Sequence, residues 1–128
     1  MAKRLLQKKI NIDAFVSSPA KRAKKTAQLF ADAYGRHEGD VIYISALYQA
    51  PAEFFYEVID DLDDHFDSVA IFAHNPGITH FVNDLTDAVK LDNLPTCGVF
   101  AVSAAITQWS VFAKAKTEFL FYDYPKNI

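Results

Sequence analysis

The chain has 128 residues, of which 51% are hydrophobic, and its formal net charge is −3. This length suits one domain with a single core over residues 1–128, and the mild negative charge gives no electrostatic reason to expect nucleic acid or an acidic membrane as a partner. Cys97 is the only cysteine, which excludes an intramolecular disulfide and a metal cluster built from cysteines.

No stretch approaches the roughly 20 consecutive apolar residues that a membrane-spanning helix needs. The first nine residues are basic but lack the apolar core of a signal peptide. We therefore expect a cytoplasmic protein without a membrane partner.

The first two expected elements are a helix and a strand. Residues 2–9 show the pattern of an amphipathic helix, with Leu5 and Leu6 on the buried side and lysines outward. Residues 12–16 form a short apolar run, which predicts the first strand of this chain.

A turn of Ser17, Ser18 and Pro19 ends that strand and starts a helix. Ser18 suits the N-cap position and Pro19 the first helical position, where a missing N–H costs nothing. The helix is expected to run to about Tyr34. Its predicted buried residues are Ala23, Ala27, Leu29, Phe30 and Ala33.

The middle of the chain repeats this alternation of strand and helix. Residues 41–47 predict a strand, and residues 51–65 predict a helix. The expected inner face of that helix consists of Phe54, Phe55, Val58, Ile59 and Leu62.

Residues 69–73 form an uninterrupted apolar run that is too short for a helix, which is typical of a strand covered on both faces. Asn75, Pro76 and Gly77 then break the run, and apolar periodicity resumes at Ile78 in a predicted helix.

The last part of the chain predicts two strands, at residues 97–106 and 118–124. Because only a short segment around Trp109 joins them, an antiparallel pair is expected. The alternation of strands and helices before it indicates the α/β class, with a mostly parallel sheet. Open α/β sheets bind ligands at the carboxyl ends of their strands.

One candidate site residue is Arg22, in the first turn of its helix and followed by Lys24 and Lys25. Cations at this position oppose the partial positive charge of the helix N-terminus. A bound anion, held by backbone N–H groups and the guanidinium, would offset that cost. The alternative is that these side chains point into solvent.

The second candidate is His74, at the end of the apolar run of residues 69–73. Asn75 could cap the next helix or orient the imidazole, and Gly77 permits close approach of the backbone to a ligand. The alternative is a structural histidine bonded to a carbonyl. His80 is six residues away, which does not match the spacing of paired metal ligands on a helix, so we expect no metal.

These residues resemble the small phosphohistidine phosphatases, the SixA-like branch of the histidine phosphatase (phosphoglycerate mutase-like) superfamily. The resemblance covers nearly the whole chain and rests on Ser-Ser-Pro-Ala-Lys-Arg at 17–22, Ala-His-Asn-Pro-Gly-Ile at 73–78, Leu-Pro-Thr at 94–96, Trp109, and Tyr-Pro-Lys at 124–126.

The resemblance implies a three-layer α/β/α sandwich and phosphoryl transfer through a phosphohistidine intermediate. Arg22 is then similar to the second phosphate-binding arginine and His74 to the second active-site histidine, with Ser18 and Asn75 also in the phosphate site. It implies no cofactor, and a phosphorylated protein or small phosphorylated substrate as partner. Without a long insertion after residues 41–47, an exposed phosphoprotein is favoured.

The sequence departs from the family in the attacking histidine, which belongs to an Arg-His-Gly or Arg-His-Ala motif after the first strand. The only Arg-His pair here, Arg36-His37, lies in a polar stretch after a helix. We therefore expect a domain that is incomplete at its N-terminus, lacks the family's first strand, and is inactive alone. A homodimer, strand exchange or a rearranged sheet is expected to fill the gap.

Two alternatives to the phosphatase remain open. One is a non-catalytic phosphate- or phosphoprotein-binding module that keeps Arg22 and His74. The other is a plain α/β interaction domain in which both residues are structural.

Overall fold

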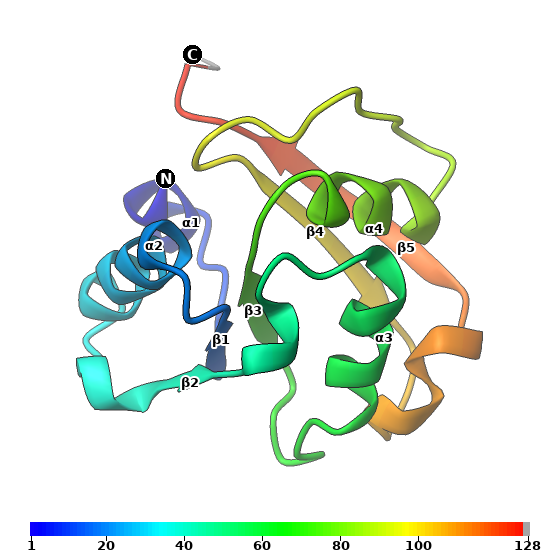
Figure 1. Cartoon of the computed structure of the whole chain (residues 1–128), viewed down its shortest axis with the longest axis horizontal. Helices are drawn as coiled ribbons and strands as arrows, with labels where there is room; N and C mark the ends of the chain where they lie inside the picture. The colour runs from blue at the N-terminus through cyan, green and yellow to red at the C-terminus, as the bar shows by residue number, and fades with distance from the viewer. Residues whose placement is uncertain (127–128) are drawn as a thin grey trace.

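The computed structural model, which describes residues 1–126, is built from alternating strands and helices (Figure 1). The elements in chain order are α1 (Ala2–Gln7), β1 (Ala14–Ser17), α2 (Lys21–Ala33), η1 (Glu38–Asp40), β2 (Val41–Tyr43), η2 (Ser45–Leu47), α3 (Ala52–Asp60), β3 (Val69–Phe72), α4 (Gly77–Leu85), β4 (Val99–Ala104), η3 (Trp109–Lys114) and β5 (Thr117–Asp123). Among the described residues, no helix is both long and apolar enough to cross a bilayer.

Three strands form a parallel sheet in the order β2-β1-β3, and β4 and β5 form a separate antiparallel pair. Phe15 of β1 is in register with Val41 on one side and Ala70 on the other. Helix α2 lies in the crossover from β1 to its parallel neighbour β2, and α3 lies in the crossover from β2 to β3 on the other side of β1. The expected α/β class, with a parallel sheet and an antiparallel C-terminal pair, is confirmed.

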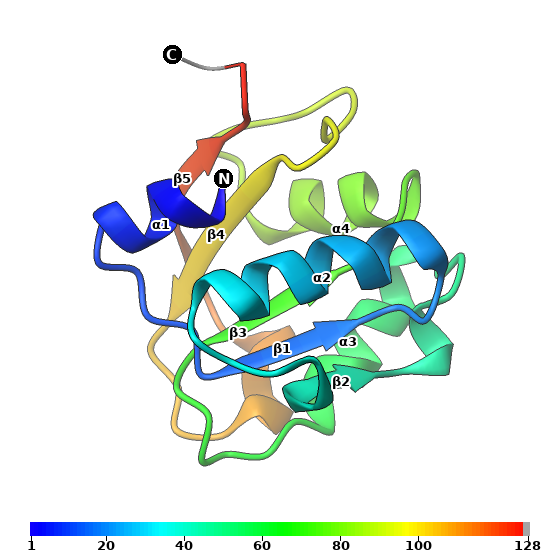
Figure 2. The same cartoon turned by 90° about the vertical axis from the view of Figure 1, so that its left-hand side faces the viewer.

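The helices form a layer on each face of the sheet, and each layer has its own apolar cluster. Ala70 and Phe72 pack with the cluster of α1 and α2, which includes Leu5 and Phe30. The alternate residues of β3 pack with the cluster of α3 and α4. Figure 2 shows α2 in front of the sheet and α3 and α4 behind it. The predicted three-layer arrangement is therefore present.

Helix α2 differs from its prediction at its start and on its buried face. It begins at Lys21, and its N-cap is Ala20 instead of Ser18, because Ser18 still belongs to the sheet edge. Leu29, predicted to be buried, is 61% exposed, whereas Ala31 is fully buried. The buried residues recur at three- and four-residue intervals, and Leu29 lies about 200° around the helix from Ala27.

The second strand and third helix are shorter than expected. The strand ends at Tyr43, and a 3₁₀ turn takes the remainder of residues 41–47. Helix α3 covers Ala52–Asp60 instead of residues 51–65. Phe54 is 39% exposed while Phe55 is 1% exposed, because neighbouring residues on a helix point about 100° apart.

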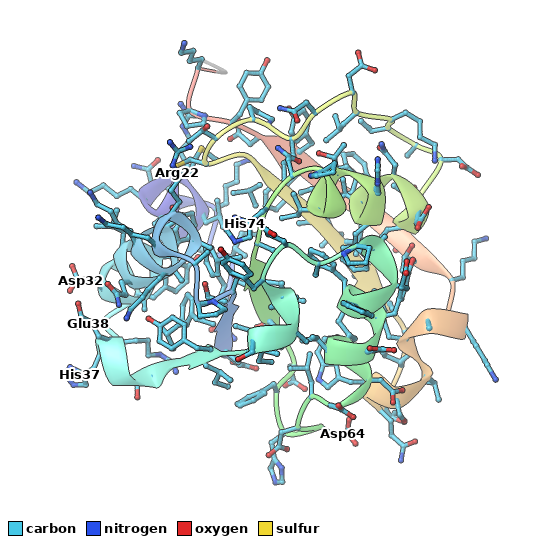
Figure 3. The ribbon with its side chains drawn as sticks, in the orientation of Figure 1. Arg22, Asp32, His37, Glu38, Asp64 and His74 are labelled. Carbon is cyan, nitrogen blue, oxygen red and sulfur yellow. The ribbon has the colours of Figure 1, made fainter. Side chains whose placement is uncertain are left out.

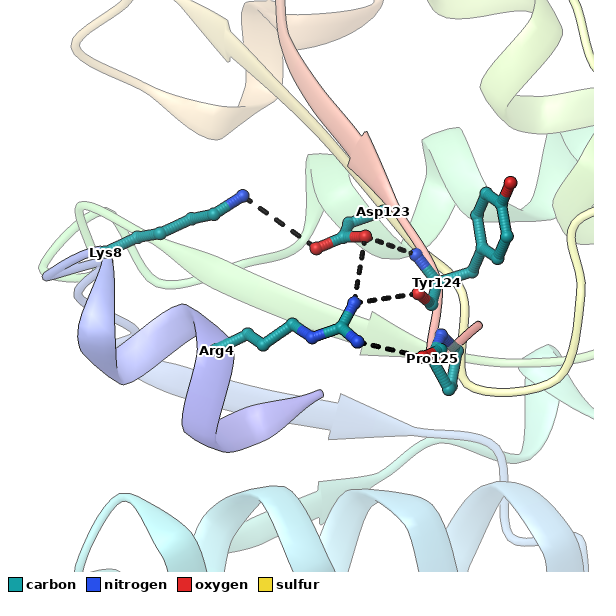
Figure 4. Close-up of polar contacts among 5 residues, drawn as sticks. All are labelled: Arg4, Lys8, Asp123, Tyr124 and Pro125. Carbon is teal, nitrogen blue, oxygen red and sulfur yellow. Dashed lines mark hydrogen bonds and ion pairs between the residues drawn. The ribbon is translucent and has the colours of Figure 1, made fainter. Parts of the chain in front are cut away.

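Helix α1 is tied to the far end of the chain by Arg4 (Figure 4). Its guanidinium donates to the Asp123 carboxylate at 3.2 Å and to the main-chain oxygens of Tyr124 and Pro125 at 2.9 and 2.8 Å. Lys8 adds an ion pair with Asp123 at 3.9 Å. These contacts fix α1 against the end of β5. Leu5 is buried as predicted, but Leu6 is 40% exposed.

Candidate functional site

The candidate site lies at the carboxyl ends of β1 and β3, which are neighbours in the parallel sheet. The backbone N–H of Ser18 donates to the Phe72 carbonyl at 2.9 Å, and the N–H of Ile44 donates to the Ser17 carbonyl at 2.9 Å. Ser17 and Ser18 are fully buried. Main-chain hydrogen bonds therefore hold the first turn after β1 against both neighbouring strands.

His74 and Ser18 meet across this edge, with His74 Nε2 and Ser18 Oγ 2.9 Å apart. Ser18 Oγ also accepts the N–H of Ala20 at 3.2 Å. When Ser18 donates its hydroxyl proton to Nε2, the imidazole proton lies on Nδ1. In the described part of the chain no hydrogen bond involves Nδ1, which leaves it available to a ligand. The Tyr48 ring stands edge-on to the half-buried imidazole, 6.4 Å between centroids.

Arg22 is exposed in the first turn of α2. This turn has no acidic residue and no side-chain cap. Figure 3 shows His74 between α2 and the loop into α4, and Arg22 beside α2. Among the described residues, no hydrogen bond or ion pair occupies the Arg22 guanidinium. The structure thus joins His74 directly to Ser18, and Arg22 follows Ser18 by four residues in the first turn of α2.

Asn75 has a different role from the two expected for it. Its Nδ2 donates to the Leu94 carbonyl at 3.0 Å, and its Oδ1 accepts the hydroxyl of Thr79. The N-cap of α4 is Pro76 without a side-chain bond. Asn75 therefore neither caps α4 nor orients the imidazole in this structure, and instead anchors the loop before β4.

Thr79 is the residue of this loop network that sequence reasoning missed. It is 4% exposed, and its Oγ1 accepts the Leu94 N–H at 2.9 Å while its hydroxyl binds Asn75. A possible signal was its position three residues before Val82 on the buried face of α4. A polar residue on that face needs a partner.

Gly77 permits a close approach, but to the protein's own backbone. A Cβ at this position would lie 1.8 Å from the carbonyl oxygen of Ala50, at the end of the segment before α3. The sequence led us to expect that Gly77 lets the backbone approach a ligand, and the contact that the structure shows is with Ala50. The small size of Gly77 lets the loop after His74 pack against the loop before α3.

The remaining histidines lie outside the candidate site. His37 is exposed at the start of η1, in the polar stretch after α2, as predicted. His65 is exposed and hydrogen-bonded to the Asp63 carboxylate, which raises the pKa of His65. Within residues 1–126, no group of three or more His, Cys, Asp or Glu side chains is arranged to hold a metal ion.

Two solved structures share this architecture. A candidate phosphohistidine phosphatase SixA from Agrobacterium tumefaciens superposes with a TM-score of 0.76 and 19% identity, covering 97% of this chain and 75% of that one. The chain has the SixA-like fold. A second candidate SixA, from Nakamurella multipartitia, gives a TM-score of 0.71 and 17% identity, covering 98% of this chain and 78% of that one.

No family model and no curated protein matches the sequence. The likeness to the SixA structures is therefore one of fold, at identities of 17–19%. In the SixA-like fold of this chain, Ser18 and His74 lie at the sheet edge where open α/β sheets bind their ligands.

Proposed function

We propose that this chain binds a phosphoryl group at the carboxyl ends of β1 and β3, and that it provides this site to a SixA-like phosphohistidine phosphatase. The observation that carries the proposal is the 2.9 Å contact between His74 Nε2 and Ser18 Oγ, next to the start of the helix that carries Arg22. An imidazole, a guanidinium and a helix N-terminus at one sheet edge suit a dianionic oxyanion.

Arg22 supplies charge to this site. Its planar guanidinium can donate two parallel hydrogen bonds to phosphoryl oxygens, and the N–H groups of the first turn of α2 point the same way. A bound phosphoryl group also offsets the repulsion between Arg22, Lys24 and the positive end of the helix. The cations at this helix start, which are unfavourable alone, become favourable around the anion.

In this proposal His74 donates a hydrogen bond to the phosphoryl group. We assign Ser18 as the donor to Nε2, 2.9 Å away, which places the imidazole proton on Nδ1, the nitrogen that bonds the ligand. This hydrogen bond strengthens as negative charge shifts in the transition state, which is where it contributes to catalysis. Ser18 acts as a positioning residue, because it reaches the ligand only through the imidazole.

The reaction we propose is hydrolysis of phosphohistidine through a second phosphohistidine. An attacking histidine takes the phosphoryl group from the substrate imidazole, and water then cleaves the new P–N bond to give phosphate. The Arg-His-Gly or Arg-His-Ala motif that carries this nucleophile in the resembling family is not in this sequence. This chain alone is therefore expected to bind phosphate without hydrolysing phosphohistidine.

An exposed phosphoprotein is the substrate class that the connection from β2 to α3 favours. Only residues 44–51, with one 3₁₀ turn, separate the two elements. This segment is shorter than the loops of about 12–15 residues or more that often form active-site lids. The opening beside His74 then remains accessible to a phosphorylated side chain on a protein surface.

Binding is tested by titrating the chain with inorganic phosphate and following the amide signals of Ser18 and Ala20 by NMR. Arg22→Ala should weaken phosphate binding by about tenfold, the loss expected for a charge-assisted bidentate contact, and His74→Gln should also weaken it. Lys25→Ala, which removes an exposed cation of the same helix, should change the affinity by less than about twofold. Equal losses for Arg22→Ala and Lys25→Ala would instead indicate diffuse charge attraction and contradict the proposal.

Catalysis is tested separately, with a phosphohistidine peptide and two polypeptides: this chain, and a form extended upstream of Met1. Hydrolysis by the extended form that requires Arg22 and His74 supports the phosphatase. Binding without hydrolysis in both forms supports a phosphoprotein-binding module. If neither form binds or hydrolyses the peptide, the plain α/β interaction domain is the reading that remains.

A further inference from the structure

We propose that a groove between β2 and the end of α3 is a docking site for a basic amphipathic helix of another protein. The groove shares no side chain with the candidate phosphate site, and its proposed role is independent of phosphate binding. Its apolar floor, its acidic rim and the negative charge at the end of α3 point to this kind of partner.

The groove has a volume of about 430 Å³ and an apolar floor. Ile42 of β2 and Ile44 just after it line one side. Val58 of α3 and Leu62 just after it line the other. Pockets that bind ligands in proteins have volumes of about 300–1,000 Å³, so this groove can hold apolar side chains of a partner.

The groove is open because α3 leaves one face of the edge strand uncovered. Val41 packs with the apolar cluster on the α2 side of the sheet, and side chains alternate along a strand, so Ile42 faces the side of α3. Ile42 is nevertheless 40% exposed. Since β2 is the outermost strand of the parallel sheet (Figure 1), a helix from a partner would lie beside α3 in the same layer and cover Ile42.

All three titratable residues that line the groove are acidic, namely Glu57, Asp61 and Asp63. They belong to residues 37–89, which contain eleven Asp and Glu residues and no Lys or Arg. In the part of the chain that the structure describes, no ion pair involves Glu57 or Asp61, and Asp63 pairs only with the neighbouring His65. The rim therefore carries negative charge that the chain itself does not neutralise, and a cationic partner complements it.

The end of α3 adds to this negative charge. The carboxyl end of a helix carries a partial negative charge, so basic side chains are favourable there and acidic ones are not. The last turn of α3 has no basic residue, whereas Glu57 and Asp60 lie within it and Asp61 is the C-cap. Lysine or arginine side chains from a partner would offset this unfavourable arrangement.

A basic amphipathic helix fits this surface better than a second copy of the chain. In a symmetric dimer through the groove, the three carboxylates of one copy would lie opposite the same three of the other, which is unfavourable. Nucleic acids and anionic lipids also carry the same sign of charge as the rim. A helix with apolar side chains at three- and four-residue intervals, flanked by lysine or arginine, matches both the floor and the rim.

The test uses a synthetic peptide of about 14 residues, with leucines at three- and four-residue intervals and lysines elsewhere. The methyl signals of Ile42, Val58 and Leu62 are followed by NMR at about 0.15 M salt, where charges more than about 8 Å apart are largely screened. We expect saturable 1:1 binding that shifts these signals. A peptide of the same composition whose leucines do not share one face should bind at least about fivefold more weakly, and one with glutamate in place of lysine should not bind.

A matched pair of charge reversals separates the groove from general attraction. Asp61→Lys reverses a charge of the rim and should weaken peptide binding by at least about tenfold. Asp87→Lys makes the same change in net charge at an exposed side chain outside the groove, and should change the affinity by less than about twofold. Equal losses in the two variants would overturn the proposal.

A second pair of variants tests the apolar floor. Ile42→Ser removes a partly exposed apolar side chain from the groove and should weaken peptide binding by about fivefold. Leu29→Ser makes a similar change at a 61% exposed position of α2, on the other face of the sheet, and should leave the affinity nearly unchanged. Urea denaturation checks that both variants are folded. Equal affinities of the two variants would contradict docking in the groove.

Size-exclusion chromatography without the peptide provides the remaining outcome. A monomer that binds the peptide through the groove agrees with the proposal. A dimer that Ile42→Ser converts to a monomer would show that a second copy occupies the groove, and would overturn the proposal, as would the absence of peptide binding by the wild type. Phosphate affinity enters none of these measurements, so failure of either proposal leaves the other standing.

Discussion

Ser18 uses its backbone for the sheet and its side chain for the candidate site. Its N–H binds Phe72 of β3, while its Oγ accepts the N–H of Ala20 and contacts His74. A buried hydroxyl with both neighbours in place loses little conformational freedom when a ligand arrives. The side chains of Ser18 and His74 are therefore already held in place at this sheet edge before any phosphoryl group binds.

Gly77 gives the clearest prediction at the scale of one residue. Gly77→Ala would place its Cβ 1.8 Å from the Ala50 carbonyl oxygen, so the start of α4 or the loop before α3 must move. We expect a loss of more than about 2 kcal/mol in the free energy of unfolding, measured by urea denaturation. Gly39→Ala is the control, because no atom lies within 4 Å of its added Cβ. An equal loss in the two variants would contradict the steric explanation.

Asp13 makes stability depend on pH. Its carboxylate accepts the N–H of Asp67 at 2.8 Å, the side chain of Asn11 at 2.8 Å and the N–H of Ser68 at 3.3 Å, and these bonds lower its pKa below the usual 3.8. A carboxyl group whose pKa is lower in the folded state stabilises the protein above its unfolded pKa. That stabilisation is lost as the pH falls through the folded pKa.

The Asp13→Asn variant isolates this contribution. We expect it to be less stable than the wild type at pH 7, with the difference shrinking as the pH falls from about 5 through the lowered pKa of Asp13. Urea denaturation at a series of pH values measures the difference. A gap between the two proteins that stays constant down to pH 2 would contradict the role of this carboxylate.

At the scale of elements, α1 depends on contacts with a distant part of the chain. A helix of six residues has little intrinsic stability, so its position comes from packing of Leu5 and from Arg4. Arg4→Ala removes three hydrogen bonds to the end of β5 and should lower the free energy of unfolding by about 1–2 kcal/mol. Lys3→Ala, an exposed position of the same helix, should be nearly neutral. Limited proteolysis near residue 8 should accelerate only in the Arg4 variant, and equal cleavage of both would contradict the anchor.

The helices and strands were predictable in kind and order, but less so in extent. Apolar spacing located α2, α3 and α4, yet Leu29 and Phe54 were assigned to the wrong faces, because a few residues of periodicity fix a helical face only approximately. The start of α2 at Lys21, with Ala20 as its N-cap, was also missed. The serine that suits an N-cap by type is held by the sheet instead.

Candidate site residues could be predicted where the local sequence around a single residue indicates its position. Arg22 and His74 stand at strand-to-helix turns, and the sequence indicates both. The bonds from Asn75 to Leu94 and Thr79 join residues that are up to 19 positions apart, so no local pattern reports them. Their existence follows only from the folded path of the loop before β4.

At the scale of the whole molecule, the composition of a strand predicts the surroundings that it prefers, but not whether a neighbouring strand is present at each of its edges. The apolar run of residues 69–73 indicated a strand covered on both faces, and in the structure an apolar cluster lies against each face of β3. Its side chains are nevertheless only half-buried, and β1 is its one neighbour among the described strands, which the composition of the run does not reveal.

The boundary between β3 and β4 also divides the molecule into two mechanical halves. In the part of the chain described here, no ladder joins the β2-β1-β3 sheet to the β4–β5 pair, so the two halves are held together by side-chain packing and by side-chain hydrogen bonds such as those of Arg4 and Asn75. Packing forces lack the directionality of hydrogen bonds, and they resist sliding less than a ladder does. We therefore expect the two halves to separate on heating before either half loses its own strands.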